Sequence, residues 1–306
     1  MMLGFVRALP FLLLAAAPAL AQDRGTLENK ELPPLAHTDA STPARQLFAR
    51  KTKPEAGPAN SIGYYSHGCL AGGVALPTDG PLWQVMRLSR NRNWGHPKLV
   101  EFIERLAEKA KRAGWPGLLV GDMSQPRGGP MLGGHASHQI GLDADIWLTP
   151  MPDHTLSRED REFMSATQMV RDDRLDVDSK VWTPAHMELI RAAAQDAVVE
   201  RIFVNAAIKK ALCREAGSAD RNWLDKVRPW WGHDYHMHIR MYCPSGSAQC
   251  KPQPPPTEGE GCGHELDYWF SHAVLHPEPK PEPEQPKHDM TMAALPPACR
   301  QVLNAP

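Results

Sequence analysis

The sequence has no excess of either charge and no long apolar run beyond its N-terminus. Lys and Arg together number 34, against 35 Asp and Glu, in 306 residues. This balance argues against a nucleic-acid-binding protein, which would carry a basic surface. A membrane-spanning helix needs about twenty consecutive apolar residues. No later segment has them, so we expect no membrane span once the N-terminal segment is removed.

Closely spaced cysteine pairs of the CxxC type are also missing. The six cysteines are spread along the chain at Cys69, Cys213, Cys243, Cys250, Cys262 and Cys299. Thiolate zinc sites normally use clustered cysteines, whereas an even, dispersed set in an exported protein predicts three disulfides. Spacing alone leaves all fifteen pairings open.

The N-terminus has the features of a secretory signal peptide. It reads MMLGFVRALPFLLLAAAPALAQD, with Arg7 before a short apolar run and Ala19-Leu20-Ala21 as a small-x-small cleavage site. Pro10 and Pro18 interrupt the run, which disfavours a membrane anchor. We therefore predict that residues 1–21 are removed on export.

The next residues contribute little patterned structure until about residue 60. Residues 22–60 are polar, rich in Pro and Ala and without a sustained period, which predicts an extended lead-in with little core of its own. Residues 97–112 then show apolar positions three and four apart, so we expect an amphipathic helix that begins at Pro97 and is ended by Gly114.

Strand and helix patterns alternate through the rest of the chain. Thr183 and Pro184 are typical of a helix start, and AAIKKALCREAG predicts a further helix ended by Gly217. Short strand patterns occur at 117–124, 143–148 and 201–205. We therefore place one main domain at 61–275, followed by a Pro-rich tail, 276–306, tied back through Cys299.

The segment YHMHIRMYC alternates strictly between apolar and polar residues. Tyr235, Met237, Ile239 and Met241 share one face, and His236, His238, Arg240 and Tyr242 share the other. His236 and His238 therefore project side by side from a strand. Two histidines at this spacing are often ordinary surface residues, so the pair alone does not establish a site.

A second polar segment, GHASHQIGLDADIWL, supplies further candidate ligands. His138 precedes a strand-like stretch that contains Asp143 and Asp145 on one face. Two neutral imidazoles and one carboxylate are a typical catalytic zinc set, with a fourth position left for water. HxxxxxxD occurs often by chance, but its combination with HxH on a second strand is rarer. Asp143 is a candidate to orient a ligand histidine.

These segments resemble a known family. GHASHQIGLDADIW, RIFVNAAIKKALC, VRPWWGHDYHMHIRMYCP and GCGHELDYWF look like motifs of the penicillin-insensitive murein endopeptidases, peptidase family M74. These belong to the lysostaphin, D-Ala-D-Ala carboxypeptidase and hedgehog-like group of metallopeptidases. The resemblance runs from about Tyr64 to Phe270. It implies an α+β fold in which an antiparallel sheet carries the zinc site, flanked by helices and braced by disulfides.

The resemblance also implies roles for individual residues. His138, Asp145 and His238 match the ligands of one catalytic Zn²⁺, and His236 matches the catalytic histidine. His233 matches a second histidine that shares acid or base work, and His135 matches a further residue near the metal. A second zinc in the family draws on an Asp and a His. Asp173 matches that Asp, but Asp176 stands where the His is expected, which puts a second zinc in doubt.

The implied disulfides are Cys69–Cys299, Cys213–Cys262 and Cys243–Cys250. The implied activity is hydrolysis of D-alanyl-meso-diaminopimelyl cross-links in peptidoglycan, in the periplasm, by a zinc-activated water. No serine is acylated, so penicillin should not inhibit. Two alternatives are a zinc D-alanyl-D-alanine carboxypeptidase and a murein-binding scaffold that keeps zinc without cutting. Homodimerisation is left open.

Overall fold

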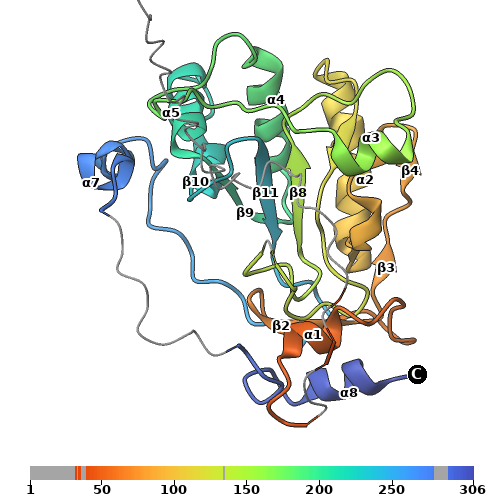
Figure 1. Ribbon diagram of the computed structural model, residues 1–306. Coiled ribbons are helices and arrows are strands. Elements are labelled where there is room, and N and C mark those ends of the chain that lie inside the picture. The colour runs from red at the N-terminus through yellow and green to blue at the C-terminus, as the bar shows by residue number, and fades with distance from the viewer. Residues whose placement is uncertain (1–31, 33, 36–38, 134, 279–288) are drawn as a thin grey trace, which may run out of the picture.

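A computed structural model of the protein describes residues 32, 34–35, 39–133, 135–278 and 289–306 (Figure 1). The predicted signal peptide lies outside these residues. The helices are α1 Ala44–Phe48, η1 Leu88–Arg90, α2 Pro97–Arg112, α3 Arg158–Phe163, α4 Pro184–Ala194, α5 Ala206–Glu215, η2 Asn222–Lys226, α6 His264–Asp267, η3 Tyr268–Phe270, α7 His272–Leu275 and α8 Ala298–Asn304. The strands are β1 Asn60–Tyr64, β2 His67–Ala71, β3 Val74–Ala75, β4 Asp79–Gly80, β5 Trp83–Val85, β6 Trp94–Gly95, β7 Leu118–Val120, β8 Asp143–Trp147, β9 Val199–Val204, β10 Val227–Pro229 and β11 His236–Met241.

A seven-stranded sheet forms the centre of the fold, in the order β10-β9-β11-β8-β7-β5-β4. Its middle strands β9, β11, β8 and β7 pair antiparallel with one another. The expectation of an α+β fold is confirmed, and the strands predicted around 117–124, 143–148 and 235–242 are present as β7, β8 and β11.

The expected antiparallel pairing is present where β8 meets β11, but the sheet as a whole is mixed. β5 runs parallel to β7, and β9 runs parallel to β10. Each of these pairs is separated in the chain by a helix, α2 in the first case and α5 in the second. Two neighbouring strands that are connected through a crossover helix can run parallel to each other, which explains both parallel pairs.

Helices α2, α4 and α5 supply much of the main hydrophobic core together with one face of the sheet. The predicted helix at α2 begins at Pro97, and its Leu99, Phe102, Ile103 and Leu106 are fully buried. They share a core with Ala144 and Ile146 of β8 and with Met237 and Ile239 of β11. The apolar positions of both strands therefore face inward, as the alternation predicts.

The other face of β8 and β11 is also buried, so it is not a solvated polar surface. Every residue of both strands is buried, including Asp143, His236, His238 and Arg240. Loops from elsewhere in the chain cover these polar side chains. Buried polar groups need partners, and these are described below.

A second apolar cluster joins the two ends of the described chain. Ala44 and Phe48 of α1 are fully buried and pack with Leu295, Val302 and Leu303 at α8. Figure 1 shows α1 and α8 side by side below β2. The lead-in, expected to be extended, therefore contains a helix with buried side chains, because the C-terminal segment supplies its partner surface.

Three disulfides brace the fold, and they join the pairs that the family resemblance implied. Cys69–Cys299 links β2 to α8, Cys213–Cys262 links α5 to the segment before α6, and Cys243–Cys250 closes a short loop after β11. Among the described residues, no helix is long and apolar enough to cross a membrane.

The Cys69–Cys299 bond should contribute more to stability than Cys243–Cys250. It spans 230 residues instead of 7, and cross-linking distant residues restricts the unfolded chain more. Replacing Cys69 and Cys299 together by Ala should lower the free energy of unfolding by about 2–5 kcal/mol. The Cys243 and Cys250 double replacement is the matched control. Chemical denaturation of both variants measures the difference, and equal losses would contradict the argument.

Candidate metal centre

The register between β8 and β11 brings the central candidate residues together. His238 lies directly opposite Asp145, and Arg240 lies directly opposite Asp143. Side chains at directly opposed positions have Cβ atoms about 5 Å apart on the same face. The two segments that carry the motifs are ninety residues apart in sequence and form one surface.

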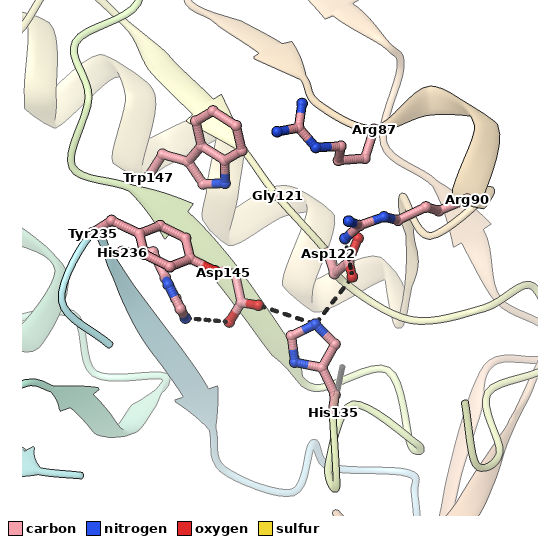
Figure 2. Close-up of a pocket in the computed structure, with 9 residues that line it drawn as sticks. All are labelled: Arg87, Arg90, Gly121, Asp122, His135, Asp145, Trp147, Tyr235 and His236. Carbon is pink, nitrogen blue, oxygen red and sulfur yellow. Dashed lines mark hydrogen bonds and ion pairs between the residues drawn. The ribbon is translucent and has the colours of Figure 1, made fainter. Parts of the chain in front are cut away.

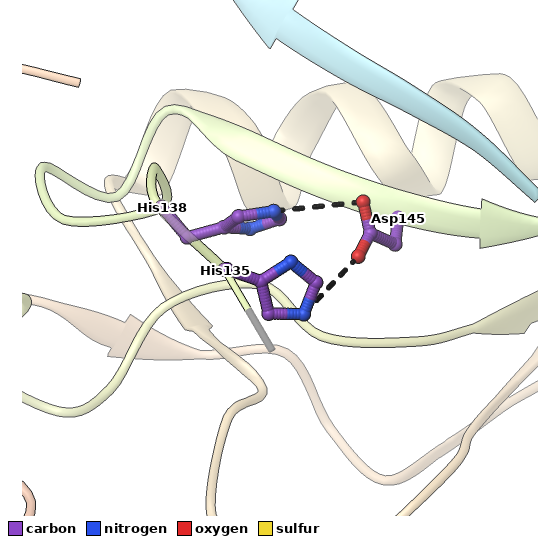
Figure 3. Close-up of side chains that lie close together, drawn as sticks. All are labelled: His135, His138 and Asp145. Carbon is purple, nitrogen blue, oxygen red and sulfur yellow. Dashed lines mark ion pairs between the residues drawn. The ribbon is translucent and has the colours of Figure 1, made fainter. Parts of the chain in front are cut away.

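His138 reaches this surface from the loop before β8. Its backbone is left-handed, with φ 67°, and its N–H donates to Asp143 Oδ2 at 3.1 Å. The side chain is fully buried, with Nε2 3.5 Å from Asp145 Oδ1. His135, His138 and Asp145 each offer a ligand atom, and these atoms lie within 4.8 Å of one another (Figure 3).

Three histidines converge on one oxygen, Asp145 Oδ1. His238 Nδ1 is 3.3 Å away, His138 Nε2 3.5 Å and His236 Nε2 3.7 Å. Asp145 Oδ1 and both ring nitrogens of His138 are buried, and none of the described residues forms a hydrogen bond with them. Leaving buried polar atoms unsatisfied costs free energy, and a cation among them would remove that cost.

Asp143 orients His238 for such a role. His238 Nε2 lies 2.9 Å from Asp143 Oδ1, and because a carboxylate accepts, this nitrogen donates. When the ring is neutral, the other nitrogen, Nδ1, carries the lone pair and faces Asp145. A carboxylate that holds the far nitrogen of a ligand histidine is common at zinc sites.

The electrostatics of the site depend on these contacts. Burial would raise the pKa of Asp145, but His138, His236 and His135 outweigh it and hold this pKa well below its usual range. Burial would lower the pKa of His238, but the hydrogen bond with Asp143 and the charges of Asp143 and Asp145 raise it to about 9. Without a metal ion, His238 is therefore protonated at neutral pH.

His135 differs from His138 because its nearer nitrogen is engaged. Its Nε2 lies 3.0 Å from Asp122 Oδ2 and 3.6 Å from Asp145 Oδ2. Burial lowers the pKa of His135, but Asp145 and Asp122 together raise it. A nitrogen that donates to Asp122 cannot also bind a metal, so this geometry favours a supporting position for His135.

His236 and His233 lie beside the cluster. Burial lowers the pKa of His236 despite the nearby Asp145, and His236 Nδ1 is buried without a hydrogen-bond partner among the described residues. The His233 ring lies 4.8 Å from the His236 ring. Its Nδ1 donates to the Trp231 carbonyl at 2.7 Å, which leaves a lone pair on Nε2. Burial, with His236 and His238, lowers the pKa of His233 to about 2.

The structure does not bring Asp173 into the cluster formed by the described residues. Asp173 is half-exposed in the loop before α4, where its carboxylate pairs with Arg171 at 2.8 Å and accepts from the Leu175 N–H. Asp176 pairs instead with Arg214 at 2.9 Å. Both carboxylates have cationic partners of their own.

Two residues of the site were not identified from the sequence. Asp122 follows β7 and forms ion pairs with Arg90 and His135 (Figure 2), and a further one with Arg92. Arg240 donates to Asp143 Oδ1 at 2.8 Å. The sequence could have identified Arg240, since it shares the polar face of β11 with both histidines. No pattern in the sequence identifies Asp122, because its partners come from distant loops.

The sequence is similar to those of named proteins over most of its length. The family model described as "Penicillin-insensitive murein endopeptidase" matches residues 61–304. A protein of that name from Klebsiella pneumoniae is 44% identical over 265 residues, which are 87% of this chain and 92% of the relative. Its namesake from Haemophilus influenzae is 46% identical over 264 residues, 85% and 88% of the two chains. The Escherichia coli K12 protein is 44% identical over 265 residues, 87% and 92% of the two chains.

Zinc binding should release about one proton per ion at pH 7, because the raised pKa of His238 keeps its ring protonated there. Affinity should therefore increase as the pH rises from 7 towards 9. Calorimetry in buffers of different ionisation enthalpy measures the released proton. In Asp143→Asn, which lacks the charge that raises this pKa, the release at pH 7 should decrease. A binding heat independent of the buffer would contradict the release of a proton from His238.

Proposed function

This chain belongs to the penicillin-insensitive murein endopeptidase family, and from that premise we propose that it hydrolyses D-alanyl-meso-diaminopimelyl cross-links in peptidoglycan. Family membership makes it a peptide hydrolase. The observation that carries the metal-dependent part of the proposal is the convergence of His138 and His238 on Asp145 Oδ1.

We assign His138, Asp145 and His238 as the ligands of one Zn²⁺. Imidazole and carboxylate are among the donor types that bind zinc. The buried atoms of His138 and Asp145 that have no hydrogen-bond partner among the described residues fit a cation. A bound zinc ion would lower the pKa of a water molecule and polarise the scissile carbonyl. Asp143 would keep the His238 ring in the ligating orientation.

His236 is the proposed general base, and His233 its partner in proton transfer. The lowered pKa values keep both rings neutral at neutral pH, so each can accept a proton. The Trp231 carbonyl fixes the His233 tautomer with its lone pair on Nε2. That nitrogen can take a proton and deliver it to the leaving amine.

A second zinc ion stays a prediction with little support. Asp173 is paired with Arg171, and Asp176 occupies the place where the family pattern has a histidine. His135 is engaged by Asp122. One catalytic ion is therefore the proposal that the side-chain contacts favour.

We further propose that the protein acts in the periplasm after removal of residues 1–21, with a fold like that of hedgehog and D-Ala-D-Ala peptidases. The catalytic domain, placed at 61–275, can be extended, since the family match continues to residue 304 and α8 packs on β2. Homodimerisation stays a prediction.

Replacing His236 by Gln should lower kcat by about 100- to 10,000-fold while the zinc content is retained, because the base and not a ligand is removed. Zinc analysis and digestion of cross-linked murein measure the two effects. His154→Gln is the matched control, because the His154 side chain is 67% exposed and pairs with the adjacent Asp153. Full activity of the His236 variant would refute the assignment.

Removing the metal with a chelator should abolish the release of monomeric muropeptides, and added zinc should restore it, whereas penicillin should have no effect. Mass spectrometry of the products also separates the alternatives. A carboxypeptidase would shorten peptide ends by one D-alanine and leave cross-links intact, and a scaffold would bind murein without forming products. Activity that survives the chelator would exclude the zinc mechanism.

A further inference from the structure

A pocket lies beside the proposed metal ligands. Its lining includes Asp145 and His236, the two arginines Arg87 and Arg90, and the aromatic residues Trp147 and Tyr235 (Figure 2). The guanidinium of Arg87 is engaged, because it donates to the carbonyls of Arg161 and Met164. Arg90 is therefore the cation of this lining that can meet a negatively charged group of the substrate.

Arg90 has an unused hydrogen-bond donor. Its Nη1 donates to Asp122 Oδ2 at 3.0 Å, but none of the described residues accepts from its buried Nη2. The side chain is only 10% exposed. Asp122 already pairs with Arg92 at 2.7 Å and with His135 at 3.0 Å. Asp122 therefore does not neutralise both arginines, and Arg90 keeps charge for another carboxylate.

The backbone around Arg90 is held in place before any substrate arrives. Arg90 ends η1, which lies between the left-handed residues Arg87 (φ 58°) and Asn91 (φ 51°). The Glu162 carboxylate accepts from both the N–H and the hydroxyl of Ser89, each at 2.7 Å. Asn91 Oδ1 accepts from Trp94 Nε1 at 2.8 Å. A preorganised guanidinium loses little entropy when it binds a ligand.

A short chain of contacts links Arg90 to the metal ligands. Arg90 contacts Asp122 at 3.0 Å, Asp122 contacts His135 at 3.0 Å, and His135 contacts Asp145 at 3.6 Å. A group close to the scissile bond, and not a remote part of the polymer, would therefore meet Arg90.

We propose that Arg90 binds the carboxylate on the carbon that carries the scissile amide nitrogen. The inference rests on the proposed function. In diaminopimelate each amine-bearing carbon also carries a carboxylate, whereas the side-chain amine of lysine sits on a plain methylene. A guanidinium fork matches a carboxylate in geometry and charge. Arg90 thus makes the enzyme specific for diaminopimelate cross-links over lysine cross-links.

The test compares a D-alanyl-diaminopimelyl dimer with the same dimer amidated at this carboxyl. In the zinc-loaded mature protein, amidation should lower kcat/KM by about 10- to 100-fold, the effect expected for losing a charge-assisted hydrogen bond. Arg90→Gln should lose a similar factor on the carboxylate dimer and should cut the two dimers at nearly equal rates. Arg92→Gln is the matched control, because Arg92 pairs with the same Asp122 but its Nη2 already donates to Gly133. The Arg92→Gln variant should still cut the carboxylate dimer faster than the amidated dimer.

A peptide that ends in D-alanyl-D-alanine carries a carboxylate at the same position, so it is a second substrate on which to test recognition of that carboxylate. Hydrolysis of this peptide that also depends on Arg90 would support carboxylate recognition and identify a carboxypeptidase activity. Equal cleavage of the two dimers by the wild-type protein would overturn the inference and leave the proposed function intact. Cleavage of neither dimer would refute the function. Binding of the amine-side product peptide to Arg90→Gln then tests the inference separately, since unchanged affinity would overturn it.

Discussion

One buried carboxylate, Asp143, holds the parts of the site in register. It is fully buried and accepts from the His138 N–H, from His238 Nε2 and from Arg240 Nε. These donors come from the loop before β8 and from two positions of β11. A single side chain thus sets the orientation of two proposed ligands that are a hundred residues apart. Burial would raise the pKa of Asp143, but Arg240 and His238 keep it below its usual range, so the carboxylate stays charged.

Arg240 reduces the free-energy cost of burying the Asp143 carboxylate. An isolated buried carboxylate would be strongly destabilising, and pairing with a hydrogen-bonded cation reduces that cost. The guanidinium itself lies over the Tyr65 ring at 4.1 Å and near the Phe203 ring at 5.2 Å, where aromatic faces favour a cation. The polar face of β11 therefore continues from the metal ligands into a packed interior. Rigid support of this kind holds the proposed ligand side chains in place before a metal ion binds.

Local patterns in the sequence predicted the elements that depend on local physics. Helix α2 begins at Pro97 and β11 has its apolar residues inward, because periodicity and capping are properties of neighbouring residues. The parallel pairs β10–β9 and β7–β5, and the packing of α1 on α8, depend on segments that meet only after folding. The disulfide pairs were accessible through the family resemblance, and spacing could not have selected them. Asp122 was missed for the same reason as α1: its partners are distant in sequence.

Backbone strain in the described chain concentrates near this site. Of the non-glycine residues with positive φ, His138 and His233 belong to the site, and Arg87 and Asn91 flank Arg90. Such residues cost of order 1 kcal/mol each and persist only where surrounding contacts over-determine them. Here the contacts are specific: Asp143 holds the His138 N–H, and the Trp231 carbonyl holds the His233 ring. The fold therefore accepts strain at the positions where side-chain direction matters most. The left-handed turns aim His138 and His233 at the surface that β8 and β11 build.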